Sequence, residues 1–410
     1  MLLALVPLFD ENMAVRAYSI FTQRDNFFLD PMMQGTRQND GAAAVYGLEM
    51  IEEMGIETIS DDSEIFVSVS NISVFSDVES QCRAPHERIV FLIDNTIPPV
   101  EMYIKRLREL KDMGYKLAIR KLAVADFENY SEVFKLMDYV LLNNRKIAID
   151  KAKIYFGKLY PNVKLVAGGI SDMETFEKLK VSGGYQLYEG DFYRVPVTKG
   201  NTEITPLKVN YIALMNSVNS ENFDLAAAAD IIGRDPALTI SLLQMVNRMT
   251  VNSGITTIRH AAAMLGQKEL RKWINTAVVK EMYADKPSEI TRLSLLRAKF
   301  AEYLAQPFSM MVKQEELFLM GLVSVLDVIL EKPMEEALEK VKVTGEVHRA
   351  LTKGEGPLAS IMELIRQYEN ANWQEVTRLL LLADKEVSVV NDCYMKSLHW
   401  YRQLMFGKEE

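Results

Sequence analysis

Ile89–Asp94 reads IVFLID, five apolar residues in a row followed by a carboxylate. A strand with one face in water alternates apolar and polar residues, whereas a strand covered on both faces is apolar throughout, as in parallel sheets. The run Lys164–Gly168, KLVAG, has the same character. Both runs predict buried parallel strands in the first half of the chain.

Strand-like and helix-like segments alternate on both sides of this run throughout the first 200 residues. The segments with strand character are Leu2–Leu8, Val15–Phe21, Ile65–Ser70, Ile89–Asp94, Tyr115–Ile119, Tyr139–Leu142, Val163–Ala167 and Tyr185–Tyr188. The segments with helical periodicity are Gly41–Met54, Val100–Met113, Glu128–Leu136, Asp150–Lys158 and Met173–Val181. Repeated strand–helix alternation predicts an α/β fold. Periodicity alone leaves a closed barrel and an open sheet as alternatives.

The pattern changes after the polar segment Val197–Pro206, VTKGNTEITP, which has the composition of a linker. From Leu207 to Phe406, apolar residues recur at helical spacing. Clear examples of predicted helices are Ala237–Asn247, Glu316–Leu330 and Ser388–Leu404. The sequence therefore predicts two domains, an α/β domain over 1–200 and an all-helical domain over 207–410.

Composition restricts the classes of function. The net charge of −9 over 410 residues argues against a protein-wide nucleic-acid-binding surface. No stretch approaches the roughly 20 apolar residues of a membrane helix, so membrane insertion is not expected. Two cysteines, Cys82 and Cys393, are too few for a disulfide framework, which predicts a cytoplasmic protein. No glycine-rich phosphate loop is present, and no cofactor is expected.

The helical half contains the string IIGRDPALTISLLQMVN, Ile231–Asn247, followed by TTIRHAAAMLG, Thr256–Gly266, and LRKW, Leu270–Trp273. These segments resemble the HDOD domain family from about Leu207 onward. The residues that match the family's signature are Arg234, Asp235, Pro236, Leu238, Leu242, Leu243 and Asn247. Asp235 and Pro236 are also a favourable pair for beginning a helix, as N-cap and first helical residue.

Two segments in the first half resemble the EAL domain family. The start, PLFDENMAVRAYSIF at Pro7–Phe21, and the close, EGDFYRVP at Glu189–Pro196, are similar to the family's opening and closing motifs. EAL domains are barrels that hydrolyse cyclic di-GMP with bound metal ions. The resemblance therefore implies a (β/α) barrel of the TIM type, and a barrel followed by an HDOD domain is a known bacterial architecture.

The metal ligands that this resemblance implies are largely replaced. Mg²⁺ and Mn²⁺ prefer carboxylate and amide oxygens. Carried over motif by motif, the family's acidic positions fall on Ser19, Arg120, Lys121, Asn143, Gly168 and Ser171, and its closing Gln falls on Glu189. Asp94 alone keeps a ligand-type carboxylate, and a residue at a strand end is more typically a solvated turn residue. One carboxylate does not make a two-metal site.

The helical half lacks the corresponding chemistry of HD-type phosphohydrolases. None of the four histidines is followed by Asp, and the stretch that carries the His-Asp pair in active relatives reads Ser324-Val325 here. His260 has a helix-surface pattern that favours a structural role over metal ligation. No metal site is expected.

The predicted function is therefore that of a non-catalytic signalling adaptor that acts by binding protein partners. Two alternatives stay open at this stage. The chain could be a sensor that binds cyclic di-GMP or a related anion without cleaving it, with Arg120 and Lys121 as contacts, although exposed cations at a strand end are ordinary. It could also retain phosphodiesterase activity. The EAL resemblance further implies pairing into a homodimer.

Overall fold

The computed structural model describes residues 2–23, 44–197, 206–220, 223–233, 236–249, 255, 257–284, 286 and 288–406. The chain forms two compact units. One, here called the barrel unit, comprises Met1–Val195 together with Leu364–Glu410, and the other, the helical unit, comprises Pro196–Glu363. The predicted domain limits, 1–200 and 207–410, stay a prediction, and the compact units divide the chain differently because its last segment belongs with the barrel.

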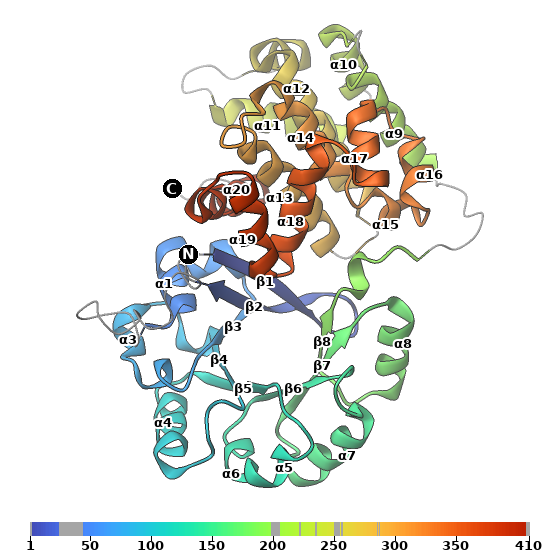
Figure 1. The fold of residues 1–410 in the computed structure, drawn as a ribbon. Coiled ribbons are helices and arrows are strands. Elements are labelled where there is room, and N and C mark those ends of the chain that lie inside the picture. The colour runs from blue at the N-terminus through green and yellow to red at the C-terminus, as the bar shows by residue number, and fades with distance from the viewer. Residues whose placement is uncertain are drawn as a thin grey trace. The chain divides into compact units, whose positions relative to one another are not determined.

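Eight strands form a closed barrel in sequence order (Figure 1). They are β1 Leu2–Phe9, β2 Val15–Gln23, β3 Glu64–Ser68, β4 Ile89–Asp94, β5 Lys116–Arg120, β6 Tyr139–Asn143, β7 Lys164–Ile170 and β8 Leu187–Gly190. Strands β2 to β8 run parallel to one another. The predicted α/β class is confirmed, and closure of the barrel excludes the open sheet.

β1 departs from the TIM pattern, because it is antiparallel to both of its neighbours, β2 and β8. Parallel neighbours need a crossover of a dozen or more residues. The connection from Phe9 to Val15 is too short for that and forms a hairpin. Asp10 closes its turn, since Oδ1 accepts hydrogen bonds from the backbone N–H groups of Asn12 at 2.8 Å and Ala14 at 3.0 Å.

Helices follow the parallel strands and cover the outside of the barrel (Figure 1). They are α1 Tyr46–Met54, α2 Ile56–Ser60, α3 Val78–Gln81, α4 Glu101–Asp112, α5 Asp126–Asn129, α6 Ser131–Phe134, α7 Ile149–Leu159 and α8 Met173–Ser182. The single helix predicted at Glu128–Leu136 was wrong. Tyr130, with ψ of 12°, separates two short helices there.

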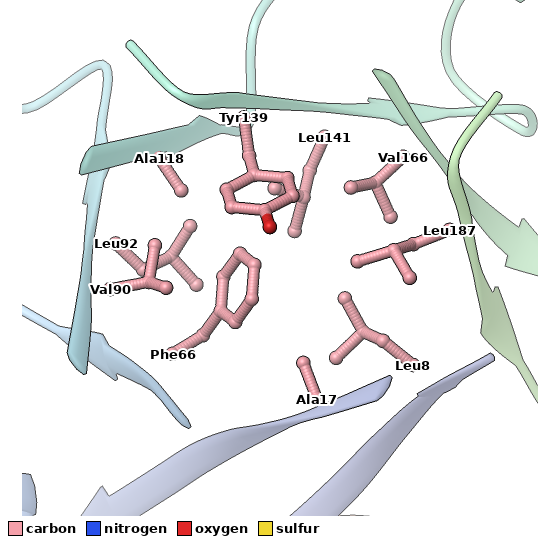
Figure 2. Packing of buried hydrophobic residues seen from close by; sticks show 10 residues of the cluster. All are labelled: Leu8, Ala17, Phe66, Val90, Leu92, Ala118, Tyr139, Leu141, Val166 and Leu187. Carbon is pink, nitrogen blue, oxygen red and sulfur yellow. The ribbon is translucent and has the colours of Figure 1, made fainter. Parts of the chain in front are cut away.

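Ten buried side chains from all eight strands fill the centre of the barrel (Figure 2). They are Leu8, Ala17, Phe66, Val90, Leu92, Ala118, Tyr139, Leu141, Val166 and Leu187. The rings of Phe66 and Tyr139 lie 5.1 Å apart between their centroids. The interior is thus a packed core, and polar chemistry is confined to the ends of the barrel.

The C-terminal segment completes the barrel unit. It contains the end of α18 Pro357–Glu369, with α19 Trp373–Leu382 and α20 Val387–Phe406, and α20 contacts β1 and α2. β1 pairs with β8 only at Leu8 and Phe9, so the rest of that edge needs other partners. The backbone N–H of Leu3 donates to the hydroxyl of Tyr368 at 3.3 Å. Tyr368 is fully buried and donates in turn to Asn391 Oδ1 at 3.1 Å.

The helical unit contains α9 Pro206–Val218, α10 Leu225–Ile232, α11 Pro236–Met249, α12 Ile258–Met282, α13 Ser288–Leu304, α14 Gln314–Val323, α15 Leu326–Leu330, α16 Met334–Leu338, α17 Gly345–Lys353 and the start of α18. The all-helical prediction is confirmed. The predicted helix Glu316–Leu330 is instead two helices, α14 and α15, separated at Ser324 and Val325. In the part of the chain that the structure describes, no helix is both long and apolar enough to span a bilayer.

Candidate functional site

Seven residues of strands β2 to β8, here called the mouth ring, form the next layer toward the carboxyl ends of the strands; four of them are the last residues of their strands, whereas Ser19 lies in the middle of β2. Each lies two positions after a core residue of Figure 2 on its own strand, and side chains two apart on a strand share a face. The ring consists of Ser19, Ser68, Asp94, Arg120, Asn143, Gly168 and Glu189. This end of a (β/α) barrel is where catalytic residues lie in barrel enzymes.

Arg120 belongs to the mouth ring, and its guanidinium contacts Ser68 and Phe21. Its Nη2 donates to Ser68 Oγ at 3.0 Å, and the guanidinium carbon lies 4.9 Å from the centre of the Phe21 ring. Burial lowers the pKa of Arg120, while Glu189 and Asp94 raise it. A guanidinium stays protonated in proteins, so the ring contains a permanent cation. Ser68 was not predicted as a site residue, although it lies within the predicted strand Ile65–Ser70.

Glu189 is a carboxylate of the mouth ring whose charge and that of Arg120 influence each other's pKa. Desolvation inside the barrel raises the pKa of Glu189, and the charge of Arg120 lowers it in part. A Cβ placed on Gly168 would lie 3.9 Å from Glu189 Oε1, so a longer side chain at 168 would enter the space beside this carboxylate. Of the two cations predicted from sequence, Arg120 and Lys121, only Arg120 belongs to the mouth ring.

Lys121 instead follows β5 with a left-handed φ of 59° and pairs with Asp94. Its ammonium lies 2.7 Å from Asp94 Oδ2, while Asp94 Oδ1 accepts from the hydroxyl and the backbone N–H of Thr96 at 2.6 and 3.0 Å. Burial raises the pKa of Asp94, but Lys121 and Thr96 outweigh it and hold that pKa below the usual range. Asp94 is therefore an ionised carboxylate whose oxygens are already in use.

Asn143 and its neighbours form a turn. Asn143 Oδ1 accepts from the backbone N–H of Arg145 at 2.9 Å, a local bond typical of Asx turns. The facing strand β7 is irregular between Ala167 and Ile170. Gly169 there has φ of 75°, and a Cβ on it would lie 2.8 Å from Asn143 Oδ1. Glycine at 169 is thus required by the close approach of these two strand ends.

Ser171 lies outside the mouth ring. It is exposed, and its hydroxyl donates to Asp172 Oδ2 at 2.7 Å. Asp172 Oδ1 accepts from the backbone N–H of Thr175 at 2.8 Å and caps α8. The nearby carboxylate at 172 therefore has a helix-capping role.

Ser19 is fully buried, and among the described residues its Oγ has no hydrogen-bond partner. The Nε of Arg120 is likewise buried without a partner in that part of the chain. Buried polar atoms in native proteins usually have a partner in the protein or in ordered water. The mouth ring thus contains two buried donors without a partner in the described part of the chain.

The helical unit places Arg297 beside Ser324, at the position where the HD-type resemblance predicts a His-Asp pair. Ser324 lies buried between α14 and α15, donates to the carbonyl of Gly321 at 2.7 Å and accepts from Arg297 Nη1 at 3.2 Å. Arg297 is 6% exposed. This position is therefore filled by a cation and a hydroxyl.

The signature residues of the helical unit have structural roles where they can be described. Arg234 and Asp235 lie outside the described residues, and Pro236 begins α11 as predicted. Leu238 and Leu242 are buried, and Leu243 is half-buried. Asn247 accepts from the backbone N–H of Ile255 at 2.6 Å and donates to its carbonyl at 2.9 Å. The described signature residues thus contribute to the core and bind the backbone of Ile255.

The mouth ring does not fit a divalent cation. Of its two carboxylates, Asp94 is paired with Lys121, and Glu189 is influenced by the charge of Arg120. The guanidinium of Arg120 would also repel a metal ion in the same ring. Metal sites for Mg²⁺ or Mn²⁺ are built from oxygen ligands with net negative charge. Across the described ranges, no cluster of three or more His, Cys, Asp and Glu side chains could hold a metal.

Comparison with known proteins confirms the HDOD resemblance. Residues 204–353 match the HDOD domain family. The chain is 26% identical over 419 residues to the uncharacterized protein YuxH of Bacillus subtilis, covering 98% of each chain. It is 26% identical over 325 residues to the cyclic di-GMP phosphodiesterase CdgJ of Vibrio cholerae, covering 78% of this chain and 74% of that protein.

Solved structures similar to the chain include two EAL domains. The EAL domain of Mycobacterium smegmatis DcpA is 15% identical, with a TM-score of 0.35, covering 46% of this chain and 89% of that one. The EAL domain protein of Listeria monocytogenes is 19% identical, with a TM-score of 0.36, covering 47% and 86%.

Proposed function

We propose that this chain is a cytoplasmic bacterial signal-transduction protein that acts through protein partners and has lost phosphodiesterase chemistry. The observation that carries the proposal is the mouth ring, where a cation, Arg120, donates a hydrogen bond to Ser68 and where Lys121 pairs with Asp94. Metal-assisted hydrolysis needs carboxylates free to hold the cations that activate water. In this ring Asp94 is paired with Lys121, and the pKa of Glu189 is raised by burial despite the nearby charge of Arg120.

The HDOD domain supplies the second half of the proposal. The buried hydrogen bond between Arg297 and Ser324, where the resemblance predicts a His-Asp pair, supports a binding role for this domain. CdgJ, by its name, acts on cyclic di-GMP, and this relative supports a place in signalling linked to that nucleotide. Affinity purification of the full chain from its native cells, with mass spectrometry of retained proteins, tests the adaptor role. Recovery of no specific protein above an unrelated control would contradict it.

An assay of hydrolysis separates this proposal from its enzymatic rival. The full chain is incubated with cyclic di-GMP and either Mn²⁺ or Mg²⁺, beside an active EAL enzyme as positive control. We expect the nucleotide to remain intact in the first reaction. Linear product at a rate above the metal-free reaction would overturn the loss of catalysis.

A second function is favoured by the unpartnered donors Ser19 Oγ and Arg120 Nε. These groups support binding of cyclic di-GMP, or a related anion, without cleavage. Isothermal titration with cyclic di-GMP tests it, and Arg120→Met is the variant that should abolish the heat. Absence of heat from the unaltered chain would remove this function. Light scattering after gel filtration tests the homodimer, which stays a prediction.

A further inference from the structure

A cavity of about 540 Å³ is lined by residues of the helical unit. It is bounded by the end of α9, by α12 and α14, and by the loop between α16 and α17. This volume is within the range of small-molecule sites. The proposed signalling function does not use this cavity, and the inference below goes beyond that function.

The floor of the cavity contains a pair of amides. Asn275 is 3% exposed and pairs reciprocally with Asn219, with N···O distances of 3.0 and 3.2 Å. Each amide group has two N–H donors, and this pairing uses one from each residue. The pair therefore has a fixed orientation and retains donor and acceptor capacity for a polar ligand.

Arg271 supplies a positive group on one wall. Its guanidinium carbon lies 5.4 Å from the centre of the Phe223 ring, and its Nη1 lies 3.5 Å from Glu315. Its Nε is buried, and no residue in the described ranges accepts a hydrogen bond from it. The Arg271 side chain as a whole is 28% exposed and lines the cavity, so a ligand can reach part of it.

The neighbouring cation Lys272 is committed elsewhere. Burial lowers the pKa of Lys272, but the hydrogen bond and the charge of Glu302 outweigh burial and raise this pKa. Glu269 lies 3.5 Å from the Lys272 ammonium group. Glu302 also accepts from Lys299 at 2.8 Å. Arg271 is thus the cation of this wall with a donor still to be satisfied.

Glu316 supplies a negative group. Its Oε2 accepts from the hydroxyl of Thr344 at 3.0 Å, and among the described residues no hydrogen bond uses Oε1. The loop that carries Thr344 is fixed by Asn216, which accepts from Lys342 N at 2.6 Å and donates to Lys340 O at 2.8 Å. The acceptor therefore sits in a built wall of the cavity.

We propose that this cavity is a binding site for a zwitterionic small molecule of the amino-acid or short-peptide class. Arg271 binds the ligand's carboxylate, Glu316 binds its ammonium group, and the amides of Asn219 and Asn275 bind its backbone. Phe318 and Val343 offer apolar contact for a side chain. Glu315 and Glu316 disfavour phosphate esters, while Arg271 and Lys342 disfavour a free metal cation.

The test uses the full chain, thermal unfolding and calorimetric titration. The probes are the free L-amino acids and glycine dipeptides at millimolar concentration, with inorganic phosphate as the rival. We expect at least one zwitterion to raise the melting temperature and to bind. Val343→Trp fills the rim of the cavity and should weaken that binding at least tenfold. Val312→Trp is the matched control, because Val312 is 100% exposed and does not line the cavity.

Chemical variants of the bound probe identify the contacts. Amidation of its carboxylate should weaken binding to the unaltered chain at least tenfold and should have little further effect in Arg271→Met. Acetylation of the probe's amine should likewise weaken binding to the unaltered chain at least tenfold and should have little further effect in Glu316→Gln. The proposal is overturned if no zwitterion binds, if phosphate alone binds, or if binding survives Val343→Trp. None of these results depends on the chain's activity toward cyclic di-GMP.

Discussion

The ammonium group of Lys121 lies 2.7 Å from Oδ2 of Asp94, across the ends of the neighbouring strands β5 and β4. The pair joins the one ligand-type carboxylate predicted from sequence to a cation of the same chain. This pairing makes Asp94 a poor metal ligand, because a carboxylate bound to an ammonium group and to Thr96 has little capacity left for a metal ion.

Lys121→Met should destabilise the protein only modestly. Lys121 has a side chain 55% exposed, so solvent screens the pair and the expected loss is about 0.5–1 kcal/mol. The folded pKa of Asp94 is below its unfolded value near 4, so the contribution of the pair is complete above that pH and is lost as the pH falls through the folded pKa. Urea unfolding of both proteins at pH 7 and at pH 3 measures the difference. A loss that is equal at both pH values would contradict this account.

Arg120→Met should cost more, about 1–3 kcal/mol, because it removes the bond to Ser68 and leaves Glu189 without its compensating charge. Glu189 already has a raised pKa, and the substitution should raise it further. A folded carboxyl with a raised pKa binds protons that the unfolded chain releases, so stability should decline as the pH rises above about 4. The cost of Arg120→Met should therefore be larger at pH 8 than at pH 5.

Glu189→Gln in the Arg120→Met background is the control for this effect. It should remove most of the pH dependence, and the two substitutions together should cost less than the sum of the single ones. Additive costs at both pH values would show that Arg120 and Glu189 do not interact.

Gly321→Ala should destabilise the helical unit by about 1–3 kcal/mol through overpacking. Gly321 lies inside α14, and an added Cβ would come within 2.4 Å of the backbone carbonyl of Arg297 in α13. Gly345→Ala is the matched control, since it begins α17 with open space around it and should be neutral or slightly stabilising. Thermal melting of the two variants compares them directly. Equal melting temperatures would refute the close contact of α13 and α14.

Tyr368→Phe should destabilise the barrel unit by about 1–2 kcal/mol, because Leu3 N–H and Asn391 lose a buried hydrogen-bond partner. Tyr103→Phe serves as control, since within the described residues the Tyr103 hydroxyl makes no hydrogen bond, and it should change stability little. Amide hydrogen exchange at Leu3 provides the local readout. Unchanged protection of Leu3 would mean that the C-terminal helices do not secure β1.

Much of the fold followed from local pattern. The apolar run Ile89–Asp94 predicted a strand with those same limits, and Pro236 began a helix as expected. Errors arose where neighbours decided the outcome. Glu316–Leu330 has continuous helical periodicity, but the chain breaks at Ser324, whose hydroxyl is held by Arg297 from another helix. Gly321 has a packing role that no periodicity reveals.

The sequence by itself determined which residues stand at the strand ends, and so identified Ser19, Arg120 and Asn143 where acidic ligands would be expected. Only the tertiary structure decided that Arg120 bonds to Ser68 in the mouth ring while Lys121 pairs with Asp94. It also brought Tyr368 to Leu3, far apart in the chain. The physical reason is that alternation and periodicity are properties of neighbours in sequence, whereas ion pairs and edge contacts depend on barrel closure, strand register and backbone φ.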